Sequence, residues 1–110
     1  MTCKAIFFDL DGTLASFSTH KVPASAKRAL ELAAAQGIKL FLATGRHPLQ
    51  FRQKGIVDDL PFDGFITSNG QYCYNSDGVI HQKTISHSDK VALVDQLKDL
   101  PYPVTFTAVS

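Results

Sequence analysis

The sequence predicts an α/β fold built on a Rossmann-like, doubly wound parallel sheet. Over residues 5–67, three short apolar runs alternate with two segments of helical character, and each run ends in polar, glycine-containing sequence. Such alternation is typical of a parallel sheet with crossover helices. Right-handed crossovers bring the carboxyl ends of the strands to one edge of the sheet, where these folds bind ligands. We therefore expect the three polar strand ends to lie together.

The three predicted strands are residues 5–8, 38–43 and 65–67. The first is the continuous apolar run AIFF, which favours a strand buried on both faces. Polar residues follow each strand at once, with DLDGT after the first, TGR after the second and SNG after the third. These three short segments form the candidate site.

Two helices are predicted between the strands. Ser25 is the expected N-cap of a helix over residues 26–36, and Gly37 stands where a left-handed C′ glycine ends a helix. Pro48 fits the first turn of a second helix, which we expect to run to about Leu60. Both helices would serve as crossovers between parallel strands.

The pattern changes after the third strand. Residues 71–74 and 79–83 flank the turn sequence NSDG and predict a β-hairpin. Ser86, with Asp89 three residues on, resembles a capping box that opens an amphipathic helix. Residues 104–109 alternate as a strand does, and the sequence stops inside this predicted strand.

Composition and charge restrict the function classes. The chain has 11 basic and 10 acidic side chains and a net charge of +1, so we expect no nucleic-acid partner and no attraction to anionic membranes. No apolar run is long enough to span a bilayer, and the N-terminus has no secretory h-region, so we expect a soluble, cytoplasmic protein. Cys3 and Cys73 are expected to be buried free thiols. The oligomeric state is not set by the sequence.

Asp9 and Asp11 carry the chemistry predicted for the first strand end. Alternate residues of an extended strand point to the same side, so both carboxylates would face one pocket. Two carboxylates this close repel each other unless a cation or a proton lies between them, and oxygen-rich coordination suits Mg²⁺. With its charge masked by the metal, Asp9 can attack a phosphorus atom, while Asp11 protonates the leaving oxygen and later deprotonates water.

Gly12 and Thr13 complete the motif D-x-D-G-T. Gly12 allows close approach of the backbone, so its N–H and the neighbouring N–H groups are expected to hold phosphoryl oxygens, and Thr13 adds a hydroxyl. The alternative is an Asx-type turn with a glycine breaker. Four fixed residues directly after a buried strand make the catalytic interpretation the more specific one.

Three segments together resemble the haloacid dehalogenase superfamily of phosphatases and phosphotransferases. Residues 7–14 (FFDLDGTL) are similar to its motif I and residues 42–46 (LATGR) to its motif II. Residues 68–70 (SNG) resemble a segment typical of the Cof-like branch, whose members carry a type IIB cap. The match covers roughly the first 85 residues in the right order and spacing, which is more specific than any single motif.

The resemblance implies a role for each site residue. Asp9 would become the aspartyl-phosphate, Asp11 would be the acid/base, and Mg²⁺ would be held by the Asp9 carboxylate and the Asp11 main-chain carbonyl. The expected contacts to phosphate or substrate come from the same strand ends: Leu10, Gly12, Thr13, Thr44, Gly45, Arg46 and Asn69.

Several of these residues keep a second interpretation. Thr44 is expected to bind the phosphoryl group through its hydroxyl, with a helix N-cap as the alternative. Arg46 suits a phosphate or substrate anion, with a surface ion pair as the alternative. Asn69 with Gly70 is either part of the site or only a turn. His47 is expected to be a solvated loop histidine.

The resemblance also implies a division of the chain. Residues 1–84 would be the N-terminal part of the catalytic core with its hairpin, and residues 85–110 would begin an α+β cap domain. The family's lysine and distal acidic pair follow the cap, and Lys83, Lys90 and Lys98 do not match that lysine. We therefore expect the N-terminal piece of a longer protein, nearly inactive by itself.

The leading hypothesis is a Mg²⁺-dependent phosphatase that acts on a small phosphorylated metabolite, with sugar phosphates as the expected class. A phosphomutase of the same superfamily is the close alternative. A non-catalytic domain that retains the fold is the alternative from a different class. A receiver domain fits poorly, because its acceptor aspartate would follow the third strand, where this chain has SNG.

Overall fold

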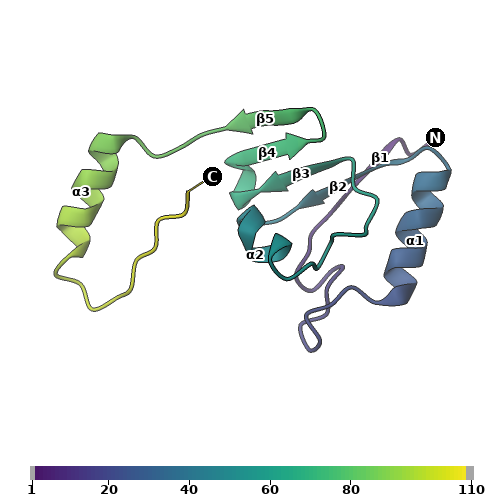
Figure 1. Ribbon diagram of the computed structural model, residues 1–110, viewed down its shortest axis with the longest axis horizontal. Coiled ribbons are helices and arrows are strands. Elements are labelled where there is room, and N and C mark those ends of the chain that lie inside the picture. The colour runs from purple at the N-terminus through teal and green to yellow at the C-terminus, as the bar shows by residue number, and fades with distance from the viewer. Residues whose placement is uncertain (1, 109–110) are drawn as a thin grey trace.

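The computed structural model describes residues 2–108 and contains a five-stranded sheet in the order β1-β2-β3-β4-β5 (Figure 1). The strands are β1 (Ala5–Phe8), β2 (Lys39–Ala43), β3 (Gly64–Thr67), β4 (Tyr72–Asn75) and β5 (Gly78–Gln82). β1, β2 and β3 pair in parallel, whereas β4 and β5 join antiparallel. The predicted α/β fold, with its parallel strands and following hairpin, is confirmed.

The core lies on one face of the parallel strands. Its buried residues come from β2, from the turn after β1 and from the two segments that cross over: Leu10, Leu14, Ala15, Leu30, Leu40, Leu42, Phe51 and Val57. Leu10 is fully buried and Leu14 nearly so. Since both lie in the turn that carries Asp11, apolar packing holds this turn in place from two sides.

The opposite face of β1 and β2 is open. Phe7 is 58% exposed, and its ring stacks on that of Phe41 with 4.8 Å between the ring centroids. The prediction that β1 is buried on both faces is therefore wrong for residues 2–108, because the core covers only one face. Cys3, expected to be buried, is exposed, and Cys73 is partly buried.

The first crossover helix, α1 (Ala24–Ala35), begins two residues earlier than predicted. Pro23 is its N-cap residue, in an extended conformation and with no side-chain cap bond, so the prediction of Ser25 as N-cap is wrong. The predicted C-terminal end is confirmed. Gly37 has φ +83°, its N–H donates to the Ala34 carbonyl, and the Ile38 N–H donates to the Ala33 carbonyl. This pair of bonds is a Schellman motif.

The second helix, α2 (Pro48–Arg52), is much shorter than the predicted segment to Leu60. Gly55 adopts φ +62°, which favours glycine, and its N–H donates to the Arg52 carbonyl at 3.0 Å. The next N–H, that of Ile56, turns back to Phe51. A left-handed glycine therefore ends α2 after little more than one turn, and the chain reaches β3 through consecutive turns.

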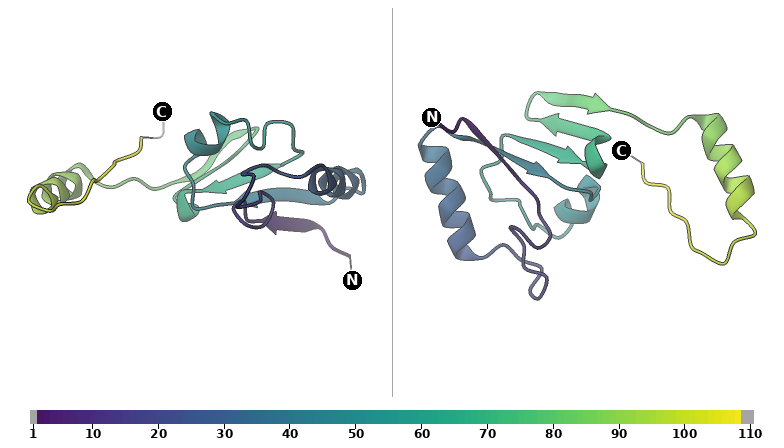
Figure 2. Two further views of the ribbon diagram at one scale, coloured as in Figure 1. Left: turned by 90° about the horizontal axis from the view of Figure 1, so that it is seen from below. Right: turned by 180° about the vertical axis from the view of Figure 1, so that it is seen from behind.

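The last helix, α3 (His87–Leu97), stands apart from the sheet in every view (Figures 1 and 2). Its predicted N-cap is confirmed, since the Ser86 side chain accepts the Asp89 N–H at 3.1 Å. No residue of α3 is buried. Residues 104–108 form no strand, contrary to the prediction, because an extended segment needs a partner strand; Val109 lies outside the described residues. None of the described helices is long and apolar enough to cross a membrane.

Candidate active site

The ends of β2 and β3 are joined by backbone hydrogen bonds into one structure. The Thr44 N–H donates to Ile66 at 2.8 Å, and the Asn69 N–H donates to Thr44 at 3.3 Å. The Arg46 carbonyl accepts the Ser68 N–H at 3.0 Å. The donors Ser68 and Asn69 belong to the short helix η1 (Ser68–Gly70). The residues after β2 and β3 are therefore hydrogen-bonded to each other, and the Arg46 side chain reaches from them to Asp11 after β1.

Asp9 follows β1 and is exposed to solvent. Its Oδ1 accepts the N–H of Leu10 at 2.8 Å. Among residues 2–108, no lysine, arginine or histidine forms a salt bridge with it. Among the described residues, Asp9 thus presents a carboxylate without a counter-ion at the edge of the sheet.

Asp11 has a different environment. The Arg46 guanidinium donates from Nε to Oδ2 at 2.8 Å and from Nη2 to Oδ1 at 2.6 Å. The side chain of Arg46 is 26% exposed and that of Asp11 is 37% exposed. The ion-pair alternative for Arg46 is therefore what the structure shows, and its partner is the second aspartate of the motif. The two aspartates therefore differ: among the described residues Asp9 has no ion-pair partner, whereas Asp11 is paired with Arg46.

The turn after Asp9 is closed by its own backbone. The Leu10 carbonyl accepts the N–H groups of Leu14 and Ala15 at 3.1 and 2.8 Å. Gly12 has φ +77°, a left-handed conformation that favours glycine, and an added Cβ would also force the exposed ring of Phe17 to move. The Gly12 N–H donates to the Ala15 carbonyl at 2.8 Å. It is therefore not free for a phosphoryl oxygen, contrary to the expectation.

Other N–H groups at the strand ends fit that role better. Within residues 2–108, the N–H groups of Asp11 and Gly45 donate to no protein acceptor. The N–H of Leu10 is bonded to Asp9, and the Leu10 side chain is buried, which leaves this residue a structural role here. Thr13 is exposed, and its N–H makes a 3.3 Å bond to the Leu10 carbonyl.

Thr44 is buried at the end of β2, with an exposure of 6%. Its Oγ1 accepts the N–H of Arg46 at 3.1 Å. The hydroxyl proton is thus still available to a ligand oxygen, because this bond uses only an acceptor lone pair. The N-cap alternative for Thr44 is excluded, since His47 caps α2.

His47 is partly buried and has a structural function, so the expectation of a solvated loop histidine is wrong. Its Nδ1 accepts the Leu49 N–H at 3.3 Å, and the Gln50 side chain accepts the His47 N–H at 2.9 Å. This reciprocal pair is a capping box. Its Nε2 is buried without a hydrogen-bond partner in the described part of the chain.

Asn69 lies against the backbone of Gly45. A Cβ added at Gly45 would be 2.8 Å from the Asn69 Oδ1. Ser68, Asn69 and Gly70 all have positive φ, at 51°, 56° and 92°. The segment is therefore both a tight turn and a neighbour of the site, and the two interpretations of Asn69 do not compete.

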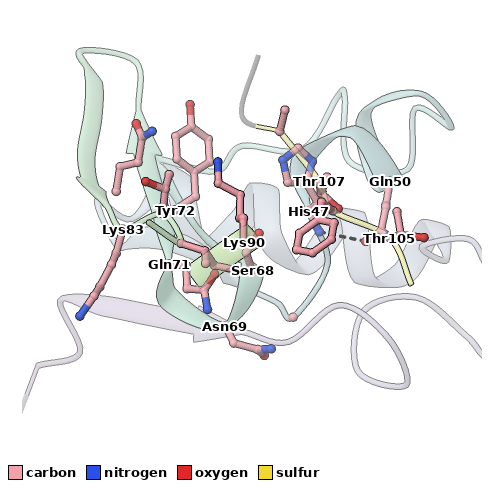
Figure 3. A pocket seen from close by; sticks show the side chains of 16 residues that line it. His47, Gln50, Ser68, Asn69, Gln71, Tyr72, Lys83, Lys90, Thr105 and Thr107 are labelled. Atoms are coloured by element: carbon pink, nitrogen blue, oxygen red, sulfur yellow. Dashed lines mark hydrogen bonds between the residues drawn. The ribbon is translucent and has the colours of Figure 1, made fainter. Parts of the chain in front are cut away.

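A cavity of about 720 Å³ lies beside these strand ends (Figure 3). Gly45 and Asn69 contribute to its wall, together with the hairpin, α3 and the segment after α3. Its lining includes Tyr72, Lys83 and Lys90, and no described aspartate or glutamate. The aspartates of the motif are not part of its wall. This grouping could not be read from the sequence, because residues of β4, β5 and α3 come together around the cavity only in the folded chain.

The donor set fits Mg²⁺ in part. Mg²⁺ in proteins is commonly held by one or two carboxylates, with water and substrate phosphate completing its shell. The free Asp9 carboxylate can serve as one ligand, and no described residue donates a hydrogen bond to the Asp11 main-chain carbonyl. Among residues 2–108 there is no group of three or more His, Cys, Asp or Glu side chains that could hold a metal by themselves.

Comparisons with known proteins agree with this geometry. The chain is 32% identical to YkrA of Bacillus subtilis (strain 168) over 108 residues, which are 98% of this chain and 41% of YkrA. It matches the structure of BT1666, a phosphatase from Bacteroides thetaiotaomicron, with a TM-score of 0.74 and 37% identity, over 88% of this chain and 35% of that one. For the subclass IIB sugar phosphatase BT4131, the TM-score is 0.67 and the identity 40%, over 86% and 37% of the two chains.

The chain thus spans well under half the length of each of these proteins. The model of the haloacid dehalogenase-like hydrolase family matches residues 6–110, which include all three strand ends and the hairpin. As the motifs predicted, the chain belongs to the haloacid dehalogenase-like hydrolase family.

Proposed function

We propose that this chain supplies the nucleophile and the acid/base of a Mg²⁺-dependent phosphatase that acts on a small phosphorylated metabolite. The observation that carries the proposal is the division between the two aspartates. Asp9 is exposed and has no counter-ion among the described residues, whereas Asp11 is held by Arg46. An unpaired carboxylate is available to attack phosphorus, whereas a carboxyl group held by a guanidinium is fixed in place and can carry a proton once one of its two bonds to Arg46 opens.

The reaction proceeds in two steps. A carboxylate oxygen of Asp9 attacks phosphorus, the bond from phosphorus to the leaving oxygen breaks, and the carboxyl proton of Asp11 passes to that oxygen. Asp11, now a carboxylate, takes a proton from water as the water oxygen attacks the aspartyl-phosphate. The bond from phosphorus to Asp9 breaks, so that inorganic phosphate leaves and Asp9 is regenerated.

Three groups at the strand ends are suited to hold the phosphoryl oxygens. They are the Thr44 hydroxyl, whose proton is free, and the unpaired N–H groups of Asp11 and Gly45. Fixed donors of this kind stabilise the charge that spreads over the phosphoryl oxygens in the transition state. Mg²⁺, bound by the Asp9 carboxylate and the Asp11 carbonyl, would offset the negative charge of nucleophile and phosphate.

The substrate class that we propose is a sugar phosphate. The support is the similarity to the sugar phosphatase BT4131 and the polar cavity next to Gly45 and Asn69. About 720 Å³ is within the usual size range of small-molecule sites. Its hydroxyl, amide and ammonium groups suit the hydroxyl-rich leaving group of such an ester.

We propose the activity for a polypeptide of its relatives' length. Residues 1–84 would form part of the catalytic core, and residues 85–110 the beginning of a cap. The strand ends described here include no lysine to compensate the charge of Asp9 and phosphate. Because electrostatic stabilisation usually supplies the largest catalytic term, we expect the 110-residue chain alone to be nearly inactive.

The test uses the protein translated from the complete reading frame that contains this sequence. With Mg²⁺ present, we expect it to hydrolyse 4-nitrophenyl phosphate and to release inorganic phosphate from sugar phosphates. Asp9→Asn should lower kcat by at least about 10³-fold, because the nucleophile is lost. Asp77→Asn is the matched control, since Asp77 lies in the exposed hairpin turn, and it should retain full activity. Undiminished turnover by Asp9→Asn would refute the proposal.

A further inference from the structure

The two-point contact between Arg46 and Asp11 fixes the direction of the Asp11 carboxyl group. Both carboxylate oxygens are engaged by one planar guanidinium, at 2.8 and 2.6 Å. A single hydrogen bond leaves a carboxyl group free to turn, whereas a paired contact sets its plane. Both partners are more than half buried, so solvent screening is reduced.

The backbone of Arg46 is itself held from two sides. Its N–H donates to the Thr44 hydroxyl at 3.1 Å, and its carbonyl accepts the Ser68 N–H at 3.0 Å. Arg46 therefore connects the end of β1 to the joined ends of β2 and β3. The backbone from which the guanidinium extends is therefore held by hydrogen bonds at the ends of β2 and β3.

We propose that Arg46 is the positioning residue for Asp11, holding it where the leaving oxygen will arrive; this role rests on the proposed function. At least one of the two hydrogen bonds has to break before Asp11 can carry a proton for that oxygen. The remaining bond keeps the carboxyl group in place. Arg46 acts through Asp11, and phosphate binding is left to Thr44 and the free N–H groups.

This role has a specific kinetic consequence. A good leaving group departs with little help from an acid, whereas a poor one depends on proton transfer. Misplacing Asp11 should therefore reduce the hydrolysis of phenyl phosphate more than that of 4-nitrophenyl phosphate, which has nearly the same shape. Losing a phosphate-binding arginine would instead reduce both rates equally and weaken the binding of vanadate, a phosphate analogue.

The experiment compares kcat/KM for the two esters in the protein from the complete reading frame. For Arg46→Ala we expect a loss about 10-fold larger with phenyl phosphate than with 4-nitrophenyl phosphate, and unchanged inhibition by vanadate. Arg46→Lys retains the charge but not the two-point contact. Its loss of kcat/KM should again be larger with phenyl phosphate than with 4-nitrophenyl phosphate, but the difference should be smaller than for Arg46→Ala. Arg28→Ala, on the exposed face of α1, is the control and should change neither rate.

A double-variant cycle adds a second readout. In a protein that already carries Asp11→Asn, the further change Arg46→Ala should lower kcat/KM by less than about 2-fold, because the carboxyl group that Arg46 positions is gone. Equal losses on both esters, or weaker vanadate binding, would overturn the role of Arg46 in an active enzyme. If the wild-type protein hydrolyses neither ester, the proposed function fails, and the role of Arg46 fails with it.

Discussion

The strand-end region and the region after β5 differ in what holds them. The ends of β1, β2 and β3 are fixed by buried leucines, by backbone hydrogen bonds between β2 and β3, and by the contact from Arg46 to Asp11. α3 has no buried residue, and residues 98–108 are exposed. Packing and hydrogen bonds between elements therefore stabilise the first region. In the described part of the second region, only the local hydrogen bonds of α3 stabilise the structure. The candidate catalytic groups all lie in the first region.

The largest expected effect compares one apolar residue from each region. Leu42 in β2 is fully buried, whereas Val94 in α3 is 54% exposed. Leu42→Ala should lower the free energy of unfolding by about 2–5 kcal/mol, since it leaves a cavity in the core. Val94→Ala should change it by less than about 0.5 kcal/mol. Urea denaturation followed by fluorescence or circular dichroism measures both, and equal losses would remove the distinction between the regions.

Two glycines sharpen the comparison within the first region. Gly12 and Gly37 both have positive φ, but an added Cβ meets the Phe17 ring only at Gly12 and finds open space at Gly37. We expect Gly12→Ala to cost about 2 kcal/mol of stability and Gly37→Ala about 1 kcal/mol. In a Phe17→Ala background the cost of Gly12→Ala should fall to that of Gly37→Ala. Persistence of the difference in that background would show that the ring is not its cause.

The two helix caps give the smallest expected effect. His47 caps α2, which carries the buried Phe51, whereas Ser86 caps α3, which buries nothing. His47→Ala should lower the free energy of global unfolding by about 1 kcal/mol. Ser86→Ala should reduce helical circular dichroism and leave the midpoint of global unfolding unchanged. A shift of that midpoint by Ser86→Ala would mean that α3 is coupled to the core.

Features determined by neighbouring residues could be predicted from the sequence. The spacing of the apolar runs predicted the strands, Gly37 predicted the end of α1, and Ser86 predicted the start of α3. The meeting of the strand ends followed from parallel connectivity, which depends on the order of elements and not on side-chain detail.

Features that depend on competing local signals or on distant partners were predicted less well. Pro23 displaced Ser25 as the N-cap of α1, and the left-handed Gly55 ended α2 early. Arg46 and Asp11 are 35 residues apart, and only the folded sheet determines which of the two aspartates the guanidinium reaches. The role of Arg46 therefore became specific only with the structure.

The most direct test of the proposed chemistry is to trap the phosphoryl group on the enzyme. The Asp11→Asn variant of the full reading-frame product, mixed with 4-nitrophenyl phosphate and Mg²⁺, should accumulate the intermediate, because deprotonation of the attacking water is slowed. After acid quenching and proteolysis, mass spectrometry should find phosphate on the peptide that contains Asp9, and none after the further change Asp9→Asn. Phosphate on another residue would contradict the assignment of Asp9 as nucleophile. The assignment would also be contradicted if the wild-type enzyme turns over while neither it nor the Asp11→Asn variant carries phosphate on Asp9.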